Sequence, residues 1–72
     1  MSKMYTAKFD RIPSGYVGQL IEWPAVISEG ETLEECREML IDAAAEMALA
    51  YRDKGMAIPA PSAVIDRIAV EV

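Results

Sequence analysis

The segment Gly30-Glu31-Thr32-Leu33-Glu34-Glu35 decides the fold, because it marks the start of a long helix. In this capping box the Thr32 hydroxyl is expected to accept a hydrogen bond from the Glu35 backbone N–H. The Glu35 carboxylate is expected to accept one from the Thr32 N–H. The helical pattern continues to about Lys54, and Gly55 is placed to end the helix in the left-handed conformation.

Three strands are predicted before this helix and one after it. Residues 4–12 and 63–72 alternate apolar and polar side chains, whereas residues 16–23 are rich in aromatic and β-branched types. A turn at 13–15 joins the first two strands, and residues 25–28 form a short third strand. The sequence therefore predicts an α+β domain ordered β-β-β-α-β, with an antiparallel, hairpin-based sheet packed on one face of one long helix.

The predicted helix has three faces at about 100° per residue. The face expected to cover the sheet is apolar: Leu33, Cys36, Leu40, Ala43, Ala44, Met47 and Tyr51. The opposite face is acidic: Glu31, Glu35, Glu38, Asp42, Glu46 and Asp53. A second apolar set lies between them: Ile41, Ala45, Ala48 and Leu49. This second set is either ordinary surface apolar residues or a contact with another protomer or a partner.

Length and composition narrow the classes of protein. The chain has 72 residues with 7 basic and 12 acidic side chains, a net charge of −5, no histidine and one cysteine. One small domain over residues 1–72 is expected, with a thin core that favours oligomerisation or a partner. Neither an internal disulfide nor a structural zinc site is expected. No signal peptide or membrane-spanning segment is apparent, so we expect a cytoplasmic protein.

Negative charge is concentrated between Glu22 and Glu46. This segment holds eight acidic residues and one basic residue, Arg37, which gives a net charge of −7. The acidic balance argues against a general nucleic-acid binder, since such proteins cluster lysine and arginine. The segment is either a solvated helix face or a docking surface for a basic partner.

Catalytic motifs are sparse. Without histidine the chain has no histidine-based acid–base pair or triad, and its glycines are too far apart for a phosphate loop. Cys36 falls on the core face of the helix and is expected to be a buried apolar residue. Asp10, Glu46 and Asp66 are the carboxylates that a two-metal nuclease would need, but their positions do not predict convergence. We therefore expect no enzyme activity, catalytic residue, metal or cofactor.

The residues also resemble the HicB antitoxin family in its short, single-domain form, over nearly the whole chain. The resemblance rests on several short segments: Tyr5 and Ala7, Gly15-Tyr16, Glu22-Trp23-Pro24, Val26-Ile27-Ser28-Glu29-Gly30-Glu31-Thr32-Leu33-Glu34-Glu35, and the helix exit Gly55-Met56-Ala57-Ile58-Pro59-Ala60-Pro61-Ser62. Two positions depart from the family pattern, since Ala25 stands where glycine is frequent and Cys36 where alanine is usual.

This resemblance implies a partial ribonuclease H-like fold without nuclease activity. It also implies a bacterial type II toxin–antitoxin system, in which the chain binds and inhibits a HicA-type toxin, a small basic RNA-cleaving protein. Homo-oligomers are common in the family. Many members carry a C-terminal DNA-binding domain, but we expect no separate one here, and so no direct nucleic-acid binding.

Two functions follow as alternatives. The chain is an antitoxin-like inhibitor of such a toxin, or an orphan HicB-like homo-oligomeric module that binds another protein. The residues predicted to bind the partner are Tyr16, Glu22, Trp23, Glu38 and Asp42. Those predicted at an oligomer interface are Ile41, Ala45, Ala48 and Leu49. Trp23 also has a structural interpretation, as a residue that caps the core.

Overall fold

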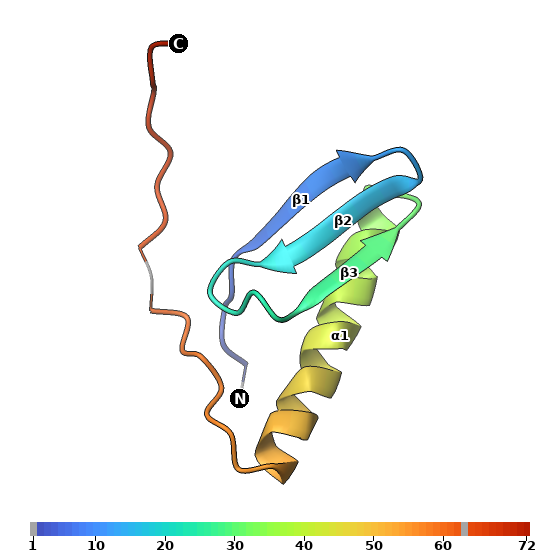
Figure 1. The fold of residues 1–72 in the computed structure, drawn as a ribbon, viewed down its shortest axis with the longest axis vertical. Helices are drawn as coiled ribbons and strands as arrows, with labels where there is room; N and C mark the ends of the chain where they lie inside the picture. The colour runs from blue at the N-terminus through green and yellow to red at the C-terminus, as the bar shows by residue number, and fades with distance from the viewer. Residues whose placement is uncertain (1, 63) are drawn as a thin grey trace.

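The structure, a computed structural model, describes residues 2–62 and 64–72. It contains strands β1 (Ala7–Ile12), β2 (Gly15–Leu20) and β3 (Ile27–Gly30), followed by helix α1 (Leu33–Asp53). The strands form one antiparallel sheet in the order β1-β2-β3, and α1 lies across one face of that sheet (Figure 1). The α+β class and the helix-on-sheet packing are therefore confirmed.

The β1–β2 hairpin closes where the turn was predicted. Ile12 pairs with Gly15, and the register continues without a bulge to Ala7 opposite Leu20. Gly15 has φ of +143°, a conformation that L side chains rarely adopt, which explains why glycine stands there. Beyond the paired strands, the Ile21 N–H donates to the Thr6 carbonyl at 2.8 Å and extends the ladder by one bond.

Both ends of α1 follow their local signals. The Thr32 side chain accepts a hydrogen bond from the Glu35 N–H at 3.0 Å, which confirms the first half of the predicted capping box. At the other end the Lys54 N–H donates to the Ala50 carbonyl, and Gly55 takes φ of +66°. The glycine relieves the steric penalty of the left-handed conformation, so the helix ends there.

A small core fills the space between sheet and helix. Its buried side chains come from β2, the β2–β3 loop and α1: Leu20, Trp23, Val26, Cys36 and Leu40. Half-buried Ala43, Ala44, Met47 and Tyr51 continue the predicted apolar stripe along α1. Leu33, expected in that stripe, is exposed because it begins the first helical turn, beyond the covered surface.

Two glycines let α1 approach the sheet closely. A Cβ atom built on Gly30 would lie 2.5 Å from the Cys36 backbone nitrogen, and one on Gly18 would lie 3.2 Å from the Cys36 sulfur and 2.8 Å from the Phe9 ring. Cys36, facing both positions, has no exposed surface. A glycine inside a strand marks either a bulge or a close backbone approach, and at Gly18 the unbroken register together with this contact identifies the second.

The predicted final strand is wrong for the described residues. Residues 64–72 carry no strand, and no backbone hydrogen bond joins them to the sheet. Ala63, included in the predicted range, lies outside the described residues. The reason is physical: alternating side chains favour an extended chain, but a strand also needs a neighbour for its N–H and C=O groups. The fold seen within the chain is thus β-β-β-α with an extended C-terminal segment (Figure 1).

Gly30→Ala is expected to destabilise the fold by about 1–3 kcal/mol, because its Cβ would collide with backbone that cannot rotate away. Gly55→Ala is the matched control, since open space surrounds that position and only the left-handed conformation is penalised, by about 1 kcal/mol. Urea unfolding followed by circular dichroism measures both variants. Equal losses for the two would show that the helix–sheet contact at Gly30 is not tightly packed.

Candidate protein-binding surfaces

The acidic face of α1 is fully available to solvent. Glu38, Asp42 and Glu46 follow one another at four-residue spacing, so they form a row on one side of the helix. All three are exposed. Among the described residues the one salt bridge joins Lys8 and Asp10 on β1, so none of the three acids is neutralised within the chain. This row can attract a basic surface from outside.

Tyr16 lies at the far end of β2 from Glu22. It is half-buried and pairs across the sheet with Arg11, whose guanidinium carbon is 5.7 Å from the centre of the Tyr16 ring. Tyr16, Arg11 and Glu31 line one shallow hollow beside the β1–β2 turn. Because β2 is six residues long, about 20 Å of strand separates this hollow from Glu22. The predicted partner-binding residues therefore do not form a single patch.

Glu22 serves as a structural anchor in the β2–β3 loop. Its carboxylate accepts hydrogen bonds from the Thr6 backbone N–H at 2.7 Å and from the Thr6 hydroxyl at 2.8 Å. The backbone hydrogen bond from Thr6 is the largest influence and lowers the pKa of the Glu22 carboxyl, since it stabilises the charged form. These bonds tie the loop to the segment that precedes β1.

Trp23 lies in the core, so the structural interpretation of this residue holds. Its side chain is only 3% exposed, and its ring packs between Tyr5 and Tyr51, with centroid separations of 6.0 and 5.1 Å. A partner cannot reach the indole without opening the core. The Nε1–H is buried and has no hydrogen-bond acceptor among the described residues. We therefore remove Trp23 from the candidate partner-binding surface.

The predicted oligomer residues divide between three environments. Ala48 is half-buried against the core, whereas Ala45 and Leu49 are exposed on the outer side of α1. Ile41, 54% exposed, lines a groove between α1 and the β1 side of the sheet. Only part of the set is therefore free to meet another molecule.

This β1 groove was not predicted. It has a volume of about 340 Å³, and the residues that line it are Lys3, Met4, Tyr5, Ala7, Phe9, Leu20, Arg37, Leu40, Ile41 and Ala44. The lining comes from the N-terminal segment, two strands and one flank of α1. No single stretch of sequence predicts this groove, because its lining residues come from separate segments. The apolar Ile41 on a flank of the helix is the one lining residue predicted from the sequence to lie at an interface.

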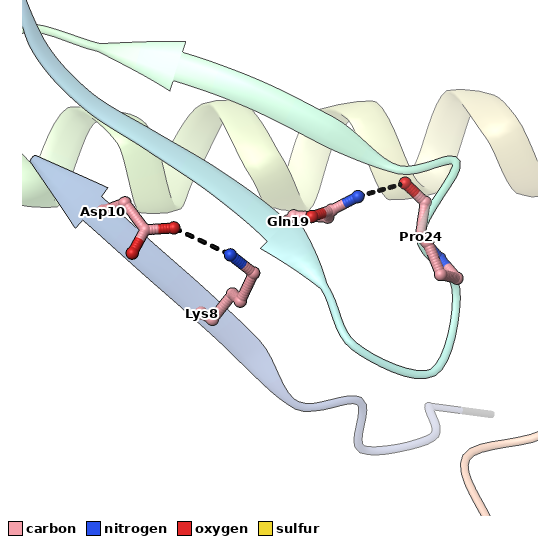
Figure 2. Close-up of polar contacts among 4 residues, drawn as sticks. All are labelled: Lys8, Asp10, Gln19 and Pro24. Atoms are coloured by element: carbon pink, nitrogen blue, oxygen red, sulfur yellow. Dashed lines mark hydrogen bonds and ion pairs between the residues drawn. The ribbon is translucent and has the colours of Figure 1, made fainter. Parts of the chain in front are cut away.

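The face of the sheet away from α1 is open and carries apolar as well as polar side chains, since Ile27, 54% exposed, pairs with Gln19. Figure 2 shows Lys8, Asp10 and Gln19 on this face, with α1 behind the sheet. The Lys8 ammonium lies 2.7 Å from the Asp10 carboxylate, and Gln19 donates to the Pro24 carbonyl at 2.8 Å. Such exposed pairs contribute little to stability, so the packing that holds the domain together lies on the other face, against α1.

The structure does not bring the candidate nuclease carboxylates together. Asp10 is on the open face of β1, Glu46 is on α1, and Asp66 is in the C-terminal segment. Within residues 2–62 and 64–72, no group of three or more potential ligands could hold a metal ion. Burial, followed by the charges of Glu29 and Glu35, raises the pKa of the Cys36 thiol, which disfavours the reactive thiolate.

The potential to span a membrane and the similarity to known proteins concern the chain as a whole. Over the described residues, no helix has both the length and the apolar character required to cross a bilayer. No family model, curated protein or solved structure matches the sequence or the fold.

Glu22→Gln is expected to lower the free energy of unfolding at neutral pH and to make that free energy depend less on pH in the acidic range. The pKa of Glu22 is lowered in the fold, so its stabilisation is complete above its ordinary value of 4.5 and is lost as the pH falls through the lower folded value. Unfolding free energies measured from pH 7 to pH 2.5 should converge for the two proteins at the acid end.

Glu46→Gln is the control for this titration, because it removes one exposed helix carboxylate elsewhere. A constant difference between Glu22→Gln and the original chain across the whole pH range would contradict the assigned role of the Glu22 charge.

Proposed function

We propose that the chain is the antitoxin of a type II toxin–antitoxin pair, a single HicB-like domain with a partial ribonuclease H-like fold. It binds and inhibits a HicA-type RNA-cleaving toxin by protein–protein contact in the cytoplasm, without enzyme activity of its own. The single observation that carries the proposal is the unneutralised acidic row on α1, Glu38, Asp42 and Glu46.

Electrostatics support a basic protein as the partner. The row lies within a segment of net charge −7, and complementary charge both speeds encounter and selects among partners. A small RNA-cleaving protein needs a basic surface for its own substrate, so an acidic helix can occupy that surface in competition with RNA. Inhibition then requires only binding, which agrees with a chain that has no catalytic constellation in its sequence.

The alternative is an orphan HicB-like module that forms homo-oligomers and binds another protein without a cognate toxin. The exposed Ile41 and Leu49 favour this function, because apolar side chains of this size on a small domain are suited to an interface between copies. The two functions share one fold and differ in whether a basic toxin is the partner.

Co-expression with the adjacent reading frame separates them. The tagged chain and its neighbour are co-purified, and RNA cleavage by the neighbour is assayed with and without the chain. A stable complex in which cleavage is suppressed supports the antitoxin function. A chain that assembles only with itself and leaves cleavage unchanged supports the orphan module.

Charge reversal on the helix should weaken the complex with the toxin. The double variant Glu38→Lys/Asp42→Lys is expected to lower affinity by about tenfold or more at low salt, with a smaller loss at high salt. Asp10→Lys is the control, since it reverses one acidic charge on the opposite face of the sheet (Figure 2). Titration calorimetry at two salt concentrations measures both variants, and equal losses would place the toxin elsewhere.

A further inference from the structure

The C-terminal segment, residues 64–72, has the side-chain pattern of a strand but pairs with no strand among the described residues. Even-numbered positions are mostly apolar, and the exposed fractions of Val64, Ile68 and Val70 are 96, 80 and 66%. The segment extends past the sheet as an isolated ribbon (Figure 1). Both its apolar side chains and its backbone groups therefore lack the contacts that a strand normally makes.

The extended C-terminal segment gives the molecule more exposed surface than a compact chain of the same length. A compact chain of 72 residues has a radius of gyration of about 11 Å, but the observed value is 13.8 Å. A folded monomer of 7.9 kDa exposes about 4,400 Å², whereas this chain exposes 5899 Å². The surplus is about 1,500 Å², and specific interfaces bury about 1,200–2,000 Å² in total. The surplus per copy is therefore large enough to build a stable dimer.

The open edge of β1 can pair with such a strand. β1 is an outer strand in the order β1-β2-β3, so one row of its backbone groups is unpaired. The β1 groove adjoins this edge, and its apolar lining includes Phe9 and Ile41. Its charged members, Lys3 and Arg37, form no salt bridge within the described residues, whereas the C-terminal segment carries Asp66 among its even-numbered positions.

The connection to the segment favours exchange between copies over folding back. The Tyr5 hydroxyl donates to the Pro59 carbonyl at 2.7 Å and fixes the chain beside the core. Pro59 and Pro61 then stiffen the exit, and the segment continues away from its own β1 (Figure 1). Because the two prolines restrict how this exit can turn back toward its own sheet, pairing with a second copy by domain swapping is favoured.

We propose that two copies of this chain exchange residues 64–72, so that the segment of each copy pairs with the outer edge of β1 of the other and places Ile68 and Val70 in its groove. The occupant of the β1 groove is therefore a second copy. This inference is independent of the toxin, since it uses neither the acidic row nor an RNA-cleaving partner.

Two variants of the full chain test the exchange. Val70→Asp puts a charge on the side that enters the groove, and Ala69→Asp puts the same charge on the neighbouring, opposite side. Loss of one buried valine contact per copy predicts a dimer dissociation constant raised about tenfold or more for Val70→Asp, and less than about threefold for Ala69→Asp. Sedimentation equilibrium measures the constants, and circular dichroism checks that both variants keep the fold.

A mixed-label experiment on the unaltered chain identifies the contact directly. In a dimer of one isotope-labelled and one unlabelled copy, filtered nuclear Overhauser spectra should connect residues 64–72 of one copy with residues 7–12 of the other. A monomer at millimolar concentration overturns the proposal. So does a dimer whose intermolecular contacts join the two C-terminal segments to each other, or one that both aspartate variants weaken equally.

Discussion

The approach of α1 to bare backbone on β2 and β3 is the constraint on which the other contacts depend. Gly18 and Gly30 leave no side chain between the sheet and Cys36, so the first turns of the helix lie directly on the strands. Because the contact is so close, the direction of α1 is fixed early in its length. This direction places Leu40, Met47 and Tyr51, in the later turns, over the core.

The far end of the domain is held differently, by hydrogen bonds around the β2–β3 loop. The Leu20 N–H donates to the Val26 carbonyl at 3.1 Å, and Glu22 ties the same loop to Thr6. Trp23, in the same loop, packs between Tyr5 and Tyr51 in the core. This domain, which buries few side chains, is therefore held by close backbone packing at one end and by hydrogen bonds around the β2–β3 loop at the other. The outer faces of α1 and β1 remain free to contact other molecules.

Local signals account for what could be predicted from the sequence. The Thr32 cap, the turn at Gly15 and the left-handed Gly55 act within a few residues, so the helix and hairpin follow from them. The β1 groove could not be predicted in the same way, because it depends on segments brought together by folding. For the same reason the sequence left Trp23 open between a core position and a partner contact, and only the fold shows it buried. Residues 64–72 have the local pattern of a strand, but a strand also requires a neighbouring strand to pair with. A local sequence pattern does not indicate whether such a neighbour is present.

Cys36 gives the helix–sheet contact an internal reporter. Its side chain has no exposed surface, its thiol lies 3.8 Å from the Ser28 carbonyl, and it is the single cysteine of the chain. A thiol reagent can reach the sulfur only when α1 lifts from the strands. The rate of alkylation under native conditions therefore depends on the opening equilibrium of this one contact. Because Cys36 is buried at this contact, one chemical label on its thiol measures how often the helix and the sheet separate locally.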